Sequence, residues 1–539
     1  MSMAASYFEH LFSAEVQDPN QAVIDKIKPC VSSEINDKLM ATYSREEVKK
    51  ALFNIGDLKA PGPDGLHSIF YKRFWYIIGE DLTDEVLLAV NNKLIPEGWN
   101  DTTIVLIPKV ENPESVTQFR PISLCNVVYK VISKLIASGL KLHLPDIISP
   151  NQSAFIPGRL IIDNVLVAYE CYHSIKNKKM GKYGNCAVKL DMHKAYDRVE
   201  WCFLKKVMII MGFDTGWVDL IMACVSSVRY QVRVNNVLSD FIYPSRGLRQ
   251  GDPLSPYLFL LCAEGLTSLL NFEEESGHLM GVKVCRGALS HLLFADASLI
   301  LMRADAGNAS SLHRALDDYC SASGQLVSEA KSSIFFSPCT EVQTRVEVCS
   351  VLNIMTEAIT NKYLGLPPLV GVDRSDCFQH IVDRVCKLLM GWKEKHLSFG
   401  GKEVLLKAVI QAIPAYAMYV FKLPKQIIKG IITAMSQFWW GDDDQKKHMH
   451  WFAWWKMCVA KKHGGMGFRD LHCFNLAMLA KQCWRIIAEP TSLCATVLRA
   501  KYFPSGDLLN CQLKKGSSYT WQSIWAGVQT FKRGHILRV

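Results

Sequence analysis

Two aspartates, Asp191 and Asp296, stand where carboxylates can do chemistry. Asp191 ends a buried-looking strand that begins at about Val188, and a helix is expected to follow. Asp296 stands in a short polar break between two apolar runs within residues 292–301, a pattern typical of a tight β-hairpin. Such carboxylates can together hold divalent metal ions, which prefer oxygen ligands and can clamp a phosphoryl displacement. The alternative for Asp296 is a turn aspartate that bonds its own backbone.

A third block, residues 246–256, lies between the two aspartates and is rich in glycine and proline. It precedes a strongly apolar helix at residues 257–263. In this order the three blocks resemble the reverse transcriptase of plant long interspersed (non-LTR) retroelements. Group II intron maturases and telomerase share the same palm. The Ala-Pro-Gly-Pro-Asp-Gly block at residues 60–65 and the tryptophan-rich tail favour the retroelement branch.

The resemblance implies an α+β fold of the right-hand polymerase type, with fingers, a palm built on an antiparallel sheet, and a helical thumb. Residues 1–89 form an N-terminal helical extension and the start of the fingers. Residues 90–370 form fingers and palm, residues 371–440 the thumb, and residues 441–539 a mainly helical, basic, Trp-rich C-terminal region. Relative to the family, the chain is expected to be truncated, without an endonuclease or a ribonuclease H domain.

The resemblance also assigns the catalytic residues. Asp191 and Asp296 ligate two Mg²⁺ ions, and the backbone carbonyl of Met192 completes a site. Lys331 corresponds to a family lysine that protonates or orients the pyrophosphate leaving group. The alternative for Lys331 is a surface lysine at the start of a strand.

Substrate contacts follow in the same way. Lys109 and Arg120 lie on a finger-like hairpin and meet the triphosphate of the incoming deoxynucleotide, since lysine and arginine both bind phosphate oxygens. The ring of Tyr196 lies beneath the sugar and collides with a 2′-hydroxyl, unless Tyr196 is only a helix core residue. Gln250 and Gly251 flank the nucleotide pocket, where glycine permits close backbone approach.

The expected macromolecular partners are an RNA template and a DNA primer. Arg159 precedes an amphipathic helix, residue 160 to about 175, and is a candidate contact to the template. Tyr363 and Gly365 belong to a segment that resembles the strand pair gripping the primer. Without the resemblance, none of these three residues would indicate a nucleic acid.

The sequence departs from the family at the hairpin tip. The family carries two adjacent aspartates there, whereas Asp296 is followed by Ala297. Loss of an oxygen ligand is expected to weaken the metal site, and misplacement by ~1 Å costs of order 10²-fold in rate. Two functions therefore remain open. One is an impaired RNA-directed DNA polymerase, and the other is an inactive retroelement remnant that at most binds nucleic acid.

Charge is unevenly distributed along the chain. Residues 421–539 hold 18 Lys and Arg against 6 Asp and Glu, a net charge of +12, so the other 420 residues carry −2 of the total of +10. The same segment contains 8 of the 13 tryptophans. Basic residues interleaved with aromatic rings suit a polyanion whose bases can stack. The alternative is a Trp-rich core surrounded by solvated lysines.

Composition places the protein inside the cell, in nucleus or cytoplasm. The 49% hydrophobic and 21% charged residues are typical of a folded, soluble protein. No apolar run approaches the ~18 residues that a membrane span needs, and the N-terminus lacks a secretory signal. The 18 cysteines are scattered without C-x-x-C spacing, as in an intracellular protein with reduced thiols.

Overall fold

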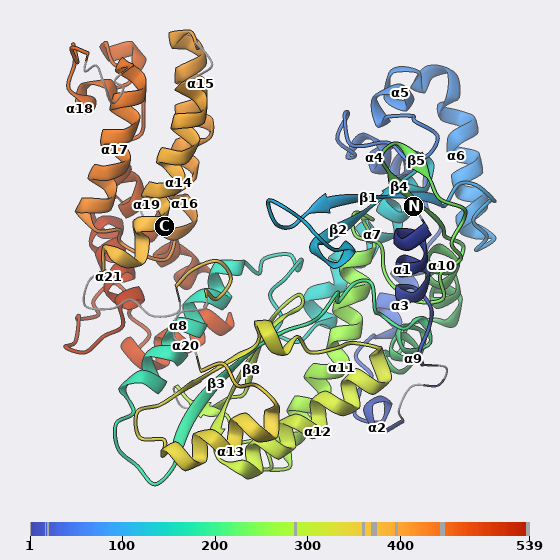
Figure 1. The fold of residues 1–539 in the computed structure, drawn as a ribbon, viewed down its shortest axis with the longest axis horizontal. Helices are drawn as coiled ribbons and strands as arrows, with labels where there is room; N and C mark the ends of the chain where they lie inside the picture. Colours follow the sequence, from blue (N-terminus) through green and yellow to red (C-terminus); the bar gives the residue numbers. More distant parts are fainter. Residues whose placement is uncertain are drawn as a thin grey trace. The chain divides into compact units, whose positions relative to one another are not determined.

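The computed structural model describes residues 2–16, 18, 21–284, 288–357, 362–367, 374–393, 397–441 and 448–534. The chain divides into two units, which are described separately (Figure 1). The first unit comprises residues 1–160, 182–282 and 290–356. The second comprises residues 161–181, 283–289 and 357–539. The expected boundary between residues 370 and 371 lies outside the described residues.

The first unit contains two four-stranded sheets. One has the strand order β2-β1-β4-β5, and the other has the order β10-β3-β9-β8. The strands are β1 (Asp101–Pro108), β2 (Phe119–Cys125), β3 (Gly184–Asp191), β4 (Arg229–Val234), β5 (Val237–Leu238), β8 (His291–Phe294), β9 (Ala297–Ala304) and β10 (Ser333–Phe336). All neighbours in the second sheet are antiparallel, whereas β1 and β4 run parallel. Sheets and segregated helices confirm the expected α+β class.

Helices make up most of the remainder of this unit. They are α1 (Ser2–Leu11), α2 (Gln21–Ile24), α3 (Ser33–Leu39), α4 (Arg45–Phe53), α5 (Ser68–Arg73), α6 (Trp75–Asn91), α7 (Val127–Ile147), α9 (Trp201–Met211), α10 (Thr215–Ser226), α11 (Ser255–Glu275), α12 (Ala306–Ser323) and α13 (Val342–Leu352). A 3₁₀ turn, η2 (Glu329–Lys331), precedes β10.

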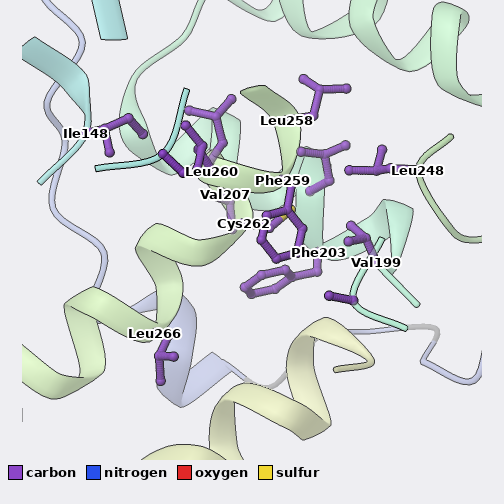
Figure 2. Close-up of a cluster of buried hydrophobic side chains, with 14 of the residues drawn as sticks. Ile148, Val199, Phe203, Val207, Leu248, Leu258, Phe259, Leu260, Cys262 and Leu266 are labelled. Atoms are coloured by element: carbon purple, nitrogen blue, oxygen red, sulfur yellow. The ribbon is translucent and has the colours of Figure 1, made fainter. Parts of the chain in front are cut away.

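One large apolar core fixes these elements. Figure 2 shows Phe203 and Val207 of α9 in one cluster with Phe259, Cys262 and Leu266 of α11. All five side chains are buried. The core continues to the strands that carry the candidate carboxylates, where Val188 and Leu190 of β3 and Ile300 and Met302 of β9 are buried. Close packing of this kind holds strand ends in fixed positions.

The segment after Asp191 differs from the sequence-based expectation. A helix was expected directly after the strand, but residues 193–198 form turns, and α9 begins only at Trp201. Lys194 has a φ of 52°, in the left-handed region that interrupts a right-handed helix. The prediction of a helix at this point was therefore wrong, and Tyr196 lies in a turn.

The second unit is mainly helical. Its helices are α8 (Ile161–Asn177), α14 (Asp376–Lys393), α15 (Phe399–Ala408), α16 (Ala415–Met418), α17 (Lys425–Trp440), α18 (Trp454–Met457), α19 (Leu471–Ala488), α20 (Leu493–Tyr502) and α21 (Tyr519–Gly534). Helix α8, assigned from the sequence to fingers and palm, groups here with α20 and α21. Two short strands, β6 (Val282–Lys283) and β7 (Ala288–Leu289), pair with each other in a separate two-stranded sheet. Among the described helices, none is sufficiently long and apolar to cross a lipid bilayer.

Candidate active site

The two predicted aspartates lie at neighbouring points of one sheet. Asp191 is the last residue of β3, and its partner in the antiparallel register is Ala297, the first residue of β9. Phe294 pairs with Ala297, so Ala295 and Asp296 form the two-residue turn between β8 and β9. The pKa of Asp296 is raised by burial and further by the negative charge of Asp191. The expected hairpin is confirmed, and its carboxylate is within electrostatic range of Asp191.

The turn has an unusual backbone that another segment supports. Ala295 has a φ of 52°, which side chains other than glycine rarely adopt. The Oε1 atom of the fully buried Gln152 accepts hydrogen bonds from the amides of Ala295 and Ala154, both at 3.0 Å. Leu293 pairs with the same segment through a parallel bridge to Gln152. Gln152 therefore holds the strained residue next to Asp296, a positioning role that the sequence did not reveal.

A lysine meets the strand-end carboxylate. Lys331 Nζ lies 3.4 Å from Asp191 Oδ1, and the lysine side chain is 66% exposed. The segment that carries Lys331 is attached to the end of β3 by a hydrogen bond of 2.8 Å from the Ser328 amide to the Asp191 carbonyl. Lys331 thus forms an ion pair with Asp191 from an exposed turn just before β10, and its role toward a leaving group stays a prediction.

The carbonyl of Met192, next to Asp191, is not used by the hydrogen bonds that attach the Lys331 segment to the end of β3. A second hydrogen bond of 2.7 Å runs from the His193 amide to the Leu326 carbonyl. Together with the Ser328 bond it forms the bridge between Met192 and Val327, and neither bond uses the Met192 carbonyl.

The predicted finger hairpin is confirmed as the β1–β2 pair. Ile107 is paired with Arg120 near its tip, and the Lys109 amide donates to the Gln118 carbonyl at 2.8 Å. Burial lowers the pKa of Lys109, and the positive charges of Lys331 and Arg120 lower it further. The charges of Lys331 and Arg120 also act on Asp296, whose pKa they lower against the effect of burial. Lys331 therefore contacts Asp191, and the charges of Lys331 and Arg120 act on Asp296, so basic side chains accompany both carboxylates.

Tyr196 lies in the turn after β3, within electrostatic range of Asp296. Its ring stacks on Phe259, with centroids 4.9 Å apart and planes inclined by 11°. Burial and the negative charge of Asp296 raise its pKa. The Leu248 amide donates to the Tyr196 carbonyl at 2.7 Å, which attaches the 246–256 block to this turn. The ring is therefore fixed beside Asp296 by the core helix α11.

Gln250 and Gly251 connect that block to β2. The Ser123 amide donates to the Gln250 carbonyl at 2.9 Å. Gly251 has a φ of 121°, and an added Cβ would come within 3.0 Å of the Ser123 carbonyl oxygen. Glycine is required at residue 251 by both conformation and space, as the close backbone approach predicts.

The remaining candidates have different surroundings. The Arg159 guanidinium donates to the carbonyls of Pro145, Ile148, Ser149 and Gln152 at 2.5–3.1 Å. Arg159 thus orders the backbone after α7, and its contact to a template stays a prediction.

Tyr363 and Gly365 belong to the second unit. Tyr363 is buried and forms a bridge with Leu366, while Gly365 has a φ of 83° in an exposed turn. Tyr363 is therefore part of the packing of this turn, and a contact of Tyr363 or Gly365 with a primer stays a prediction.

The candidate site supplies only some of the oxygen ligands that two divalent cations would need. Asp191, Asp296 and the Met192 carbonyl supply hard oxygen ligands. Ala297 stands directly across from Asp191, so a carboxylate at residue 297 would place its Cβ about 5 Å from that of Asp191. Within the described ranges, no group of three or more His, Cys, Asp or Glu side chains is arranged to hold a metal. The donor set therefore lacks the third carboxylate that the register would accommodate.

Comparison with known proteins identifies the class. The family described as "Reverse transcriptase (RNA-dependent DNA polymerase)" matches residues 107–367, a range that includes every candidate catalytic residue. The chain therefore carries a reverse transcriptase domain, similar to those of non-LTR retrotransposons, and its mixed α/β architecture is that of a right-hand polymerase.

Two of the similar proteins come from transposable elements. The chain is 26% identical over 510 residues to an uncharacterized 149 kDa protein of transposon TX1 from Xenopus laevis, covering 93% of this chain and 37% of that protein. It is 27% identical over 255 residues to a Pol polyprotein of retrotransposable element R2 from Nasonia vitripennis, covering 47% and 23%. An uncharacterized mitochondrial protein of Arabidopsis thaliana is 44% identical over 124 residues, which cover 23% of this chain and 80% of that protein. The chain thus spans well under half the length of the two transposon proteins.

Proposed function

We propose that this protein is an RNA-directed DNA polymerase of a plant non-LTR retroelement, impaired by alanine at residue 297. The observation that carries the proposal is the convergence of Asp191, Asp296 and Lys331 at the end of β3, beside a hairpin that bears Lys109 and Arg120. The match of the reverse transcriptase family to the same residues supports it. Similarity to an Arabidopsis protein supports the plant origin.

Mg²⁺ would be held by Asp191, Asp296 and the Met192 carbonyl, and it would polarise the phosphate and activate the primer hydroxyl. Lys109 and Arg120 bind the triphosphate, because their charges already converge in the protein. Lys331 balances the charge of Asp191 and is placed to donate a proton to the departing pyrophosphate.

Selection among nucleotides depends on Tyr196 and on the adjoining block of residues 246–256. The Tyr196 ring is stacked on Phe259, so it cannot move away from the 2′-hydroxyl of a bound ribonucleotide. Deoxynucleotides are therefore favoured over ribonucleotides. Gln250 and Gly251 present a backbone surface to the bound nucleotide, and Arg159, Tyr363 and Gly365 support the template and primer strands by ordering the turns in which they lie.

Alanine at residue 297 is expected to reduce the rate. With one carboxylate absent, a bound ion would have fewer ligands, and a displacement of the reacting groups by ~1 Å would cost of order 10²-fold in rate. The second candidate function follows from the same observation. If the two remaining carboxylates do not retain the ions, the protein is a catalytically inactive remnant that binds nucleic acid.

Primer extension separates the two functions. The protein is incubated with an RNA template, a DNA primer and deoxynucleotides in Mg²⁺ or Mn²⁺, beside the Asp191→Asn variant. Metal-dependent incorporation that disappears in Asp191→Asn supports the polymerase. Retained binding of template-primer without incorporation in either metal supports the remnant instead.

A further inference from the structure

Three neighbouring aromatic side chains in the second unit face solvent. Trp451 is 72% exposed, Phe452 is 56% exposed and Trp455 is 67% exposed. Tryptophan is ordinarily well buried on average, and three large exposed aromatic side chains within five residues are a candidate interaction site. We call Trp451, Phe452 and Trp455 the aromatic platform.

Inward contacts hold the platform in place. Trp454, within the same stretch, stacks on Phe468 with ring centroids 4.9 Å apart. The amides of Met466 and Phe468 donate to the carbonyl of the buried Met457 at 3.1 and 3.2 Å. The platform is therefore the outer face of a packed segment, whose inner face carries Trp454 and Met457.

The same segment is attached to the end of α17. Trp440, the last residue of that helix, stacks on His450 with centroids 5.9 Å apart, and Trp439 meets Phe468 edge to face at 5.5 Å. Figure 1 shows α18, which includes Trp455, beside α17. Such an attachment orders the backbone that carries the exposed rings, which lowers the entropy cost of binding.

The surroundings of the platform are basic. Residues 448–470 contain four Lys and Arg and a single acidic residue, Asp470. The Nζ atom of Lys456 lies 5.6 Å from the centre of the Trp455 ring. Lys461 is paired with Glu403 at 2.7 Å, whereas the exposed Lys456 and Lys462 add positive charge to the solvent-facing surface. This charge favours a polyanion over an apolar or basic protein surface.

We propose that the aromatic platform binds a single-stranded nucleic acid, whose bases stack on Trp451, Phe452 and Trp455 while Lys456 and Lys462 contact its phosphates. A single strand is required because the bases of a duplex are already stacked on one another. Base stacking on aromatic side chains combined with basic contacts is the physical basis of sequence-tolerant single-strand binding. This site does not depend on Asp191, Asp296 or residue 297, so it persists in a protein without polymerase activity.

Fluorescence anisotropy on the whole chain tests the proposal, with a labelled 20-nucleotide oligouridylate and a labelled RNA duplex as probes. Trp451→Ala combined with Trp455→Ala is expected to weaken oligouridylate binding by roughly 30-fold or more, since each lost stack costs about 1–3 kcal/mol. Duplex binding is expected to change less than about threefold, because the duplex offers no free bases.

Two further variants separate stacking from structural damage. Trp451→Phe combined with Trp455→Phe keeps two aromatic faces and is expected to restore most of the affinity. Trp484→Ala removes another exposed tryptophan, 54% accessible on α19, and is expected to leave binding unchanged. Equal affinity of the alanine pair and the unaltered protein would overturn the proposal, as would equal losses in Trp484→Ala. Self-association that disappears in the alanine pair would instead identify the platform as a contact between copies of the chain.

Discussion

The carboxylate of Glu170 and the carboxylate pair of Asp191 and Asp296 have contrasting surroundings. Glu170 of α8 is fully buried and accepts hydrogen bonds from Lys501 Nζ (2.8 Å), Tyr502 Oη (2.6 Å), Thr520 Oγ1 (2.8 Å) and Ser518 Oγ. A buried charge is tolerated only with such partners, because desolvation is otherwise too costly. Every donor comes from the C-terminal part of the chain, so Glu170 connects α8 to α20 and to the segment that opens α21.

The surroundings of Asp191 and Asp296 balance their charges less completely than those of Glu170. They are close enough that one raises the pKa of the other, and Lys331 is the cation paired with Asp191 at 3.4 Å. Their like charges are only partly balanced. A carboxylate surrounded by donors stabilises the fold, whereas a pair left close together and accessible has capacity for a bound cation. The following changes test that difference.

The largest effect on stability is expected at Glu170. Glu170→Ala leaves Lys501 and three hydroxyl groups without their shared acceptor, and removal of one partner of a buried ionic cluster costs about 3–5 kcal/mol. Urea unfolding followed by circular dichroism measures the loss. Glu489→Ala, an exposed carboxylate 3.8 Å from Arg485, is the matched control and is expected to cost under about 0.5 kcal/mol. Equal costs for the two variants would refute the contrast.

Glu264 of α11 is an intermediate case, because it is buried and its hydrogen bonds come from Ser149, whose amide donates to it at 3.3 Å. Burial raises its pKa from 4.5 to about 7. The folded state therefore binds more protons between these values, and stability falls as pH rises from about 4.5 to 7. Glu264→Gln removes this loss, so its stability relative to the unaltered protein should increase by roughly 2–4 kcal/mol between pH 4.5 and pH 8.

Thermal unfolding at several pH values checks the Glu264 prediction. Glu275→Gln, at the exposed end of the same helix, is the matched control. A stability difference for Glu264→Gln that stays constant from pH 4.5 to pH 8 would show that this carboxyl group is not desolvated.

Gln152 tests the support beneath the carboxylate pair. Gln152→Ala leaves the amides of Ala295 and Ala154 without an acceptor, at a cost of about 2 kcal/mol. The φ of 52° at Ala295 is then less well supported, so hydrogen exchange at the hairpin tip should accelerate. Gln343→Ala, on the exposed surface of α13, should change neither measurement. Unchanged exchange at residues 293–297 in Gln152→Ala would refute the positioning role.

The smallest effect on stability is expected at Asp296. Because its folded-state pKa is raised, ionisation of Asp296 opposes folding once the pH exceeds that value. Asp296→Asn should therefore increase the melting temperature slightly at pH 8 and leave it unchanged at pH 3. Under about 1 kcal/mol is at stake, because the residue as a whole is exposed even though its carboxyl group is partly desolvated. A destabilised Asp296→Asn would mean that Asp296 belongs with Glu170 among the structural carboxylates.

Local patterns in the sequence were sufficient to locate the hairpins and their charged residues. The turn bearing Asp296 and the β1–β2 pair bearing Arg120 come from segments whose partners are near in sequence. The support for Ala295 could not be predicted, because its acceptor, Gln152, lies 143 residues away. Nothing in the sequence around Gln152 indicates such a distant partner.

The second unit shows a similar limit. The helix after Arg159 was expected to be amphipathic, but α8 is buried from Val165 through Tyr172, including Glu170. An acidic residue in a helix normally indicates a solvent-facing side, and only distant partners overrule that indication. The tryptophans were equally ambiguous. Trp521 is buried and Trp455 is exposed, although both occur in basic, aromatic sequence.

The most direct test of the account is the rate of single-nucleotide incorporation by the protein with Ala297 and by the variant Ala297→Asp. Both are measured with RNA template, DNA primer and Mg²⁺. The register places residue 297 opposite Asp191, so the restored carboxylate should raise the rate by about 10²-fold. Equal rates for the two proteins would contradict the claim that the site at the end of β3 lacks a metal ligand.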